Sequence, residues 1–250
     1  MTAKVNFDVA RRIPAEYYRS ISNYNSSGLC LPPSCLSCSV FVGEFVVGLI
    51  MSSASSPITV LCIGHSHVAW LRTYVEAADW FAGFVVRGRS CNVEFLGVRG
   101  ATLSTFLAPT MMERILSYRA DVILIHLGGN DLDSRSFPNP IMIAIDIQRL
   151  ALRLVAAQVK RVVVCQVCRR QKWRRSSYSI GAERVIQVNR YLGLFCDETD
   201  GVSFWRHKRL WNSIRPVFRS DGVHFSDIGN YRFYRSVRGA IITTVASLVG

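Results

Sequence analysis

Three short motifs in the chain contain residue types that can do chemistry together. The segments Gly64–His67 and Gly128–Asp131 each follow an apolar run, and Asp221–His224 comes far downstream. Together they supply a serine, an amide side chain, and a histidine with a carboxylate three residues before it. A serine hydroxyl becomes a nucleophile when a base takes its proton, and it can then form a covalent acyl intermediate. These residues therefore predict hydrolysis by acyl transfer.

The expected catalytic group consists of Ser66, Asp221 and His224. His224 is the candidate base, and Asp221 can accept a hydrogen bond from its other ring nitrogen, which fixes the tautomer and stabilises the imidazolium. Gly222 allows the backbone to turn tightly between the two side chains.

The negative oxygen of a tetrahedral intermediate needs hydrogen-bond donors directed at it. We expect them to be the backbone N–H of Ser66, the backbone N–H of Gly100 and the side-chain amide of Asn130. Gly100 has no side chain to block the substrate, and the amide of Asn130 offers two donors in one plane.

The hydrophobic pattern predicts the elements that position these residues. Apolar runs indicate buried parallel strands at 58–64, 93–98, 121–127, 161–167 and 202–206. Helices are expected near 68–82, 102–118, 141–159 and 181–196, and from Asp227 to the end of the chain. This alternation predicts an α/β fold, a three-layer α/β/α doubly wound sheet of about five parallel strands, flavodoxin-like in its 2-1-3-4-5 order. In that order the ends of the first three strands are neighbours, so Ser66, Gly100 and Asn130 should meet at one edge.

These motifs resemble those of the SGNH hydrolase (GDSL-type esterase/lipase) family. Gly64–Ser66 is similar to its first block, Gly100 to the glycine of its second block, and Gly128–Asp131 and Asp221–His224 match its third and last blocks in full. The resemblance covers residues 58–250 and implies a serine esterase that acts on a small ester substrate without a metal or other cofactor. One position departs from the family, since His65 stands where an aspartate is usual.

Each residue also has a structural interpretation. Ser66 alone suits the N-cap of the next helix, Asp221 could cap the last helix, and Asp227 is a better candidate for that cap. His126 is expected to be a hydrogen-bonded core histidine. His65 and His67 could bind a metal together with His224, but the sequence shows no acidic ligands beside them, and we expect no metal.

The densest basic run contains Arg169, Arg170, Lys172, Trp173, Arg174 and Arg175, in a chain with a formal charge of +13. Basic side chains interleaved with an aromatic ring can bind nucleic acid, while a solvated basic loop is the simpler interpretation. SGNH domains also occur in retrotransposon-type proteins. The alternative function is therefore a catalytically weak or inactive SGNH-fold module, retroelement-derived, that binds nucleic acid through its arginine-rich loops.

Composition sets the remaining expectations. Half of the 250 residues are hydrophobic, which suits a globular domain. Residues 1–57 lack periodicity and are expected to form a poorly ordered N-terminal extension before an esterase domain over 58–250. The apolar stretch from Val40 to Met51 is too short for a membrane span. Cysteines within apolar runs suggest buried thiols in a reducing, intracellular compartment, and we expect a cytoplasmic location.

Overall fold

The computed structural model describes residues 56–134, 139–208, 210 and 217–250. The expectation of a poorly ordered extension over 1–57 therefore lies almost wholly outside the described residues. The first strand, β1, spans Ile58–Gly64, which is the range predicted for it.

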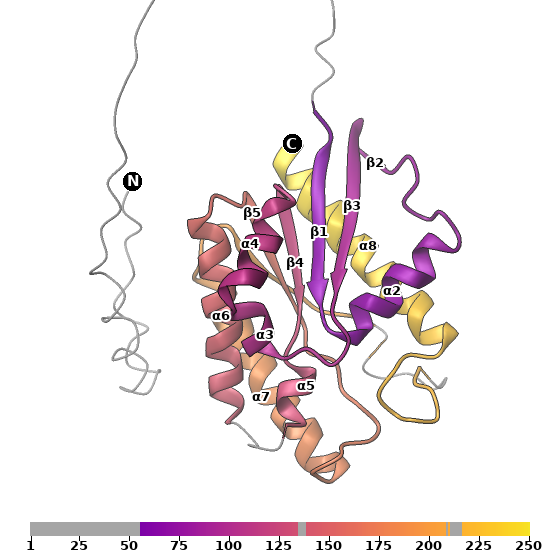
Figure 1. Ribbon diagram of the computed structural model, residues 1–250, viewed down its shortest axis with the longest axis vertical. Helices are drawn as coiled ribbons and strands as arrows, with labels where there is room; N and C mark the ends of the chain where they lie inside the picture. The colour runs from indigo at the N-terminus through magenta and orange to yellow at the C-terminus, as the bar shows by residue number, and fades with distance from the viewer. Residues whose placement is uncertain (1–55, 135–138, 209, 211–216) are drawn as a thin grey trace, which may run out of the picture. The chain divides into compact units, whose positions relative to one another are not determined.

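A six-stranded sheet forms the centre of the domain, with the order β2-β3-β1-β4-β5-β6 (Figure 1). The further strands are β2 (Val85–Val86), β3 (Arg89–Gly97), β4 (Val122–His126), β5 (Arg161–Cys165) and β6 (Val202–Trp205). Five of the six run parallel in the predicted 2-1-3-4-5 order. The short edge strand β2 pairs antiparallel with β3 and was not predicted, since two residues are too few to show a period.

Side chains of the central strands alternate between two cores, because successive residues of a strand point to opposite faces. Ile123 and Ile125 of β4 belong to one core, whereas Val122 and Leu124 belong to the other. Both sets are buried, so these strands are apolar at every position. That is the pattern of a parallel sheet covered on both faces.

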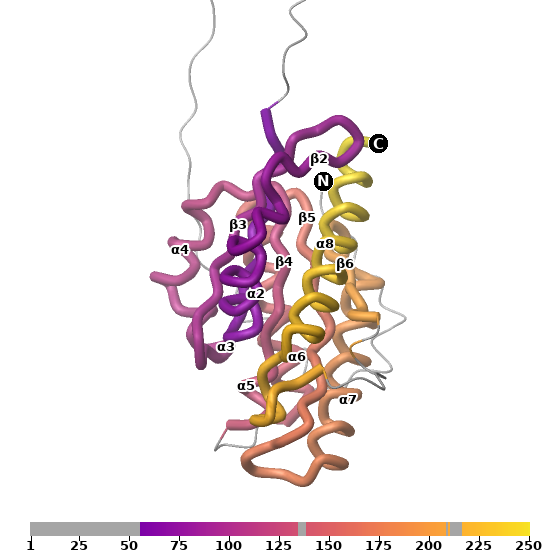
Figure 2. Tube along the Cα trace, turned by 90° about the vertical axis from the view of Figure 1, so that its right-hand side faces the viewer, coloured from indigo at the N-terminus to yellow at the C-terminus, as the bar shows by residue number. Residues whose placement is uncertain are grey.

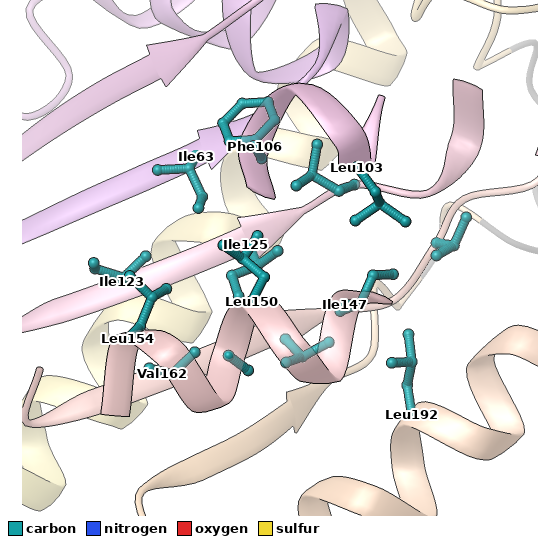
Figure 3. Close-up of a cluster of buried hydrophobic side chains, with 14 of the residues drawn as sticks. Ile63, Leu103, Phe106, Ile123, Ile125, Ile147, Leu150, Leu154, Val162 and Leu192 are labelled. Carbon is teal, nitrogen blue, oxygen red and sulfur yellow. The ribbon is translucent and has the colours of Figure 1, made fainter. Parts of the chain in front are cut away.

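Helices cover both faces of the sheet. The first core contains side chains of α3 (Leu103–Leu107), α4 (Pro109–Ser117), α6 (Pro140–Ala156) and α7 (Tyr178–Asp197). Figure 3 shows Ile123 and Ile125 of β4 beside Leu154 and Leu150 of α6. The second core contains side chains of α2 (Ser66–Glu76) and α8 (Asp227–Val249), and in Figure 2 α8 runs along the strands. The predicted three-layer α/β/α fold is thus confirmed.

One predicted helix is divided in two. The expected helix over 102–118 is broken at Ala108, which has an extended ψ of 140° and precedes Pro109, the first residue of α4. A residue before proline is driven out of the helical region by contact with the proline ring. The short helix α5 (Gly129–Leu132) follows β4.

Two expectations from composition can be compared with the described part of the chain. Its five cysteines are free and buried, as predicted. None of its helices combines the length and the apolar character that a membrane crossing requires.

Candidate functional site

The predicted site residues lie at the carboxyl edge of the sheet, where β1, β3 and β4 all point (Figure 1). Ser66 follows β1, Gly100 follows β3, and Asn130 follows β4. The loop before α8 carries Asp221 and His224. Residues far apart in the sequence therefore reach one end of the sheet because parallel strands end at the same edge.

Ser66 is the first residue of α2 and does not cap it. His65 is the N-cap, and its Nδ1 accepts a hydrogen bond from the backbone N–H of His67 at 3.4 Å. The interpretation of Ser66 as an N-cap is therefore wrong, because the neighbouring imidazole takes that role. The first turn of a helix presents N–H groups and a partial positive charge, which suit a negative intermediate at Ser66.

Asp221 and His224 form a hydrogen-bonded pair, with 2.8 Å between Asp221 Oδ2 and His224 Nδ1. The other carboxylate oxygen accepts from the backbone N–H groups of Val223 and His224. Desolvation opposes ionisation of this carboxyl, but the hydrogen bonds from Val223 and His224 hold its pKa well below the ordinary value. Asp221 does not cap α8, and neither does Asp227. Ser226 is the cap, and its hydroxyl accepts from the N–H of Gly229.

The loop that carries this pair is held from two sides. Gly222 has a φ of +67°, and a side chain there would lie 2.7 Å from Lys172 Cγ. Its carbonyl accepts from the backbone N–H groups of Gln171 and Lys172. On the other side, His67 Nε2 lies 2.9 Å from the carbonyl of Val223. The rings of His67 and Trp70 on α2 have centroids 6.4 and 6.5 Å from that of His224, so His224 lies over the first turns of the serine-bearing helix.

Asn130 is oriented by two hydrogen bonds. Its Nδ2 donates to the carbonyl of Ala101 at 2.8 Å, and its Oδ1 accepts from Arg170 at 2.6 Å. One N–H of the amide remains after the bond to Ala101. The next residue, Asp131, accepts from the N–H of Leu103 at 2.9 Å. The loop containing Gly100 is therefore tied at two points to the segment that carries Asn130.

Arg170 is buried rather than available to an external partner. Its side chain is 4% exposed and forms an ion pair with Asp133, which is 5% exposed, at 3.2 Å. Asp133 also accepts from the backbone N–H of Arg174. Burial lowers the pKa of Arg170 and Asp133 opposes that change, and the ordinary pKa of arginine is high enough to keep it charged. This ion pair fixes the loop after β5 against the loop after β4.

The proposed nucleic-acid surface is accordingly smaller than the sequence suggested. The assignment of Arg170 to that surface is wrong, because the ion pair with Asp133 occupies it inside the protein. Trp173 is half-buried and packs so closely on Gly181 that a side chain there would overlap its ring. Lys172 is exposed, but its Nζ donates to the carbonyl of Ser220. Arg169 is half-buried, while Arg174 and Arg175 are exposed.

A relay of buried histidines lies beneath the site. His67 Nε2 faces the Val223 carbonyl, which only accepts, so that nitrogen carries the proton when the ring is neutral. His67 Nδ1 must then accept from His126 Nε2 at 3.2 Å, which leaves His126 Nδ1 without a proton. Burial is the main reason why the pKa values of His67 and His126 lie well below the ordinary value, and both rings are therefore neutral. His126 is thus the hydrogen-bonded core histidine that was predicted.

Two groups of side chains in the described residues have ligand atoms close enough to hold a metal ion. One is His65, His67 and His126, and the other is His126, Cys168 and His207. The first differs from the predicted candidates, in which His224 was the third member. Both nitrogens of His67 already lie in hydrogen bonds, so metal binding in the first group would break the relay. The expectation that no metal binds here stays a prediction.

Sequence reasoning did not identify Arg170, Asp133 or His67 as residues that support the site. Their side chains act on partners 37 to 156 positions away, and local spacing carries no such information. The sequence signals were that Arg170 lies shortly after the predicted strand 161–167 and that His67 adjoins Ser66, and Asp133 had no such signal.

Comparison with known proteins gives the family of the chain and relatives of its fold. The model of the GDSL-like Lipase/Acylhydrolase family matches residues 62–232. No curated protein sequence matches the chain.

Among solved structures, a GDSL-like lipase from Bacteroides thetaiotaomicron superposes with a TM-score of 0.62 at 16% identity, over 74% of this chain and 88% of that one. A carbohydrate esterase family 3 protein from Talaromyces cellulolyticus gives 0.56 at 14% identity, over 76% and 99%. A catalytic mutant of an acetylxylan esterase from Geobacillus stearothermophilus gives 0.54 at 17% identity, over 73% and 93%. The structural similarities show the fold, and the family match supports ester hydrolysis in general.

Proposed function

Because the chain belongs to the GDSL-like lipase/acylhydrolase family, we propose that it is a serine esterase that forms an acyl-enzyme on Ser66. His224 acts as the base and Asp221 as its orienting carboxylate. The observation that carries the proposal is the 2.8 Å hydrogen bond between Asp221 and His224 over the helix that begins at Ser66.

In the first half of the reaction, His224 Nε2 takes the proton of the Ser66 hydroxyl while Ser66 Oγ attacks the ester carbonyl. Asp221 accepts from His224 Nδ1 and stabilises the imidazolium. The tetrahedral intermediate collapses, the carbon–oxygen bond of the alcohol breaks, and His224 gives its proton to the leaving alcohol. A water molecule then repeats these steps on the acyl-enzyme and releases the acid.

The oxyanion forms among the backbone N–H groups of Ser66 and Gly100 and the free N–H of Asn130. The other N–H of Asn130 is held by Ala101, and its oxygen is held by Arg170. Donors fixed before the reaction stabilise developing charge without reorganising, which makes such groups effective.

The histidine at position 65 is compatible with this mechanism. His65 replaces a carboxylate, yet it caps α2 through Nδ1 and thereby orders the turn that presents Ser66. Burial and the neighbouring His67 and His126 lower its pKa well below the ordinary value, which keeps it neutral beside the nucleophile.

A fluorophosphonate probe tests the nucleophile, since it labels activated serines covalently. We expect labelling of the wild-type protein and turnover of a short-chain aryl ester. The Ser66→Ala variant should lose labelling and about 10³-fold or more in kcat, because the residual rate comes only from oxyanion stabilisation and binding.

The matched control is Ser117→Ala, which removes an exposed serine on α4 and should keep full labelling. Undiminished labelling of Ser66→Ala would remove this serine from the mechanism.

A further inference from the structure

Two arginines share one tryptophan at the edge of the proposed site. The guanidinium carbons of Arg99 and Arg219 each lie 4.6 Å from the ring centroid of Trp70. We call these three residues the arginine–tryptophan rim. Both arginines are exposed and Trp70 is half-buried. The two cations are therefore no farther apart than twice that distance.

The rim joins three of the four segments that carry the proposed site residues. Trp70 lies one helical turn beyond Ser66, and residues with this spacing share a face of the helix. Arg99 directly precedes Gly100. Arg219 lies on the loop of the catalytic pair, where its backbone N–H donates to the carbonyl of His224 at 2.8 Å. Since the Trp70 ring is 6.5 Å from the His224 ring, the rim lies beside the reacting groups.

The positive charge of the rim has no partner in the described part of the chain. Neither arginine forms an ion pair there, although Arg72 and Arg149 elsewhere in the fold do so. The carboxylate nearest to Arg219 in the sequence is Asp221, and both of its oxygens already accept hydrogen bonds within its own loop. Arg219 uses Nε to donate to the carbonyl of Phe225, which orients the guanidinium.

Such an arrangement suits an anion. Like charges this close repel one another, and a bound anion removes that repulsion. Guanidinium groups match carboxylate and phosphate oxygens with paired donors. Each guanidinium lies over the indole ring of Trp70, which orients it and offers an apolar surface for the adjoining carbon chain of a ligand.

We infer that the arginine–tryptophan rim binds an anionic group of the substrate, so that the protein acts on small esters that carry a carboxylate or phosphate near the scissile bond. This inference rests on the proposed ester hydrolysis for its place in the reaction. It adds a specificity that neither the family match nor the related structures assign.

Paired substrates test the inference. The 4-nitrophenyl monoester of adipic acid and the 4-nitrophenyl ester of hexanoic acid have the same reacting group and the same chain length, and only the first carries a free carboxylate on its acyl chain. We expect a higher kcat/KM for the adipate ester, mainly through a lower KM. Arg99→Gln and Arg219→Gln should each reduce the ratio of the two kcat/KM values by about 5- to 10-fold, the range of a partly screened charge pair.

Arg114→Gln is the matched control, because it removes one exposed positive charge from α4. It should leave both substrates unaffected. In the wild-type protein the preference for the adipate ester should also shrink as the salt concentration is raised. Salt screens exposed charges, and the Debye length is about 10 Å at 0.1 M and shorter at higher salt. Equal rates for the two esters, or a ratio that all three variants leave unchanged, would overturn the inference.

Direct binding separates this inference from the proposed reaction. Calorimetric titration of the Ser66→Ala protein with adipate and with methyl phosphate measures anion affinity without turnover. If either anion binds, and if adding Arg99→Gln to the Ser66→Ala protein weakens that binding, the result supports the rim as an anion site. It also identifies the preferred anionic group. If neither binds, the rim is no anion site, whatever the esterase assay shows. If only a single-stranded oligonucleotide binds through these arginines, the small-ester assignment is wrong.

Discussion

At the scale of single residues, the side chain of Asn130 is held in one orientation at the proposed site. Ala101 accepts from one of its N–H groups and Arg170 donates to its oxygen, so the remaining N–H has one direction. We expect Asn130→Ala to lower kcat by about 10²- to 10³-fold with little change in KM, because the donor acts mainly in the transition state. Steady-state kinetics with an aryl ester measures both constants. A rise in KM alone would place Asn130 in substrate binding instead.

Arg170 contributes to the proposed site indirectly, because its side chain holds Asn130 and Asp133. Its removal would leave Asp133 buried and without its cation. We expect Arg170→Ala to lower the free energy of unfolding by about 3–5 kcal/mol, the usual cost of breaking a buried ion pair by removing one partner. Urea unfolding measures this change.

Arg175→Ala provides the comparison, because Arg175 is an exposed member of the same basic run. Its effect should stay within about 0.5 kcal/mol. Similar losses for the two variants would show that the Asp133 ion pair does not stabilise the fold.

At the scale of elements, the buried histidines join α2, β4 and the loop before α8. Burial is the first cause that lowers the pKa values of His65, His67, His126 and His207, and that of His207 falls to about 3. In the unfolded chain these rings titrate near the ordinary value of about 6.5. Between that pH and the lowered pKa, the unfolded state binds more protons than the folded state. Stability is therefore lost as the pH falls through this window.

We expect the free energy of unfolding to decrease steeply from about pH 6.5 downward, by up to about 1.4 kcal/mol per pH unit for each buried ring. Urea unfolding at several pH values gives the slope. His207→Gln should reduce the slope by up to about 1.4 kcal/mol per pH unit, the contribution of one buried ring. This change distinguishes the histidines from carboxylates that titrate in the same pH range. An unchanged slope in this variant would mean that His207 is accessible to protons in the folded state.

The elements also show which parts of the fold the sequence could predict. The alternation of strands with helices and the ends of the strands could be predicted, because both depend on local hydrophobic periodicity. The fully apolar β4 is an example. The break at Ala108 was missed, because the apolar period continues on both sides of it, although Pro109 is a sequence signal that marks it. The histidine relay and the Arg170 ion pair were not readable, because each depends on packing between segments distant in the sequence.

At the scale of the whole molecule, the formal charge of +13 leaves nucleic-acid binding as the competing hypothesis. The basic run now offers three exposed cations, Lys172, Arg174 and Arg175. Each phosphate neutralised on a single strand adds about −0.7 to the slope of log K against log salt. This loop alone can therefore account for a slope of only about −2.

We expect this loop not to contribute to binding of single-stranded RNA near physiological salt. The reason is that its buried side chains, Arg170 and Trp173, are held by other residues of the protein. Fluorescence anisotropy with a labelled oligonucleotide over a range of salt concentrations measures the slope. Replacing Arg174 and Arg175 by Ser should leave it unchanged, and Arg170 must be kept because its removal disturbs Asn130. If the wild-type protein binds tightly and the double variant flattens the slope by about 1.4, two phosphates lie on these side chains. The loop would then have a nucleic-acid partner, and the esterase site beside it would need to be tested again with that partner bound.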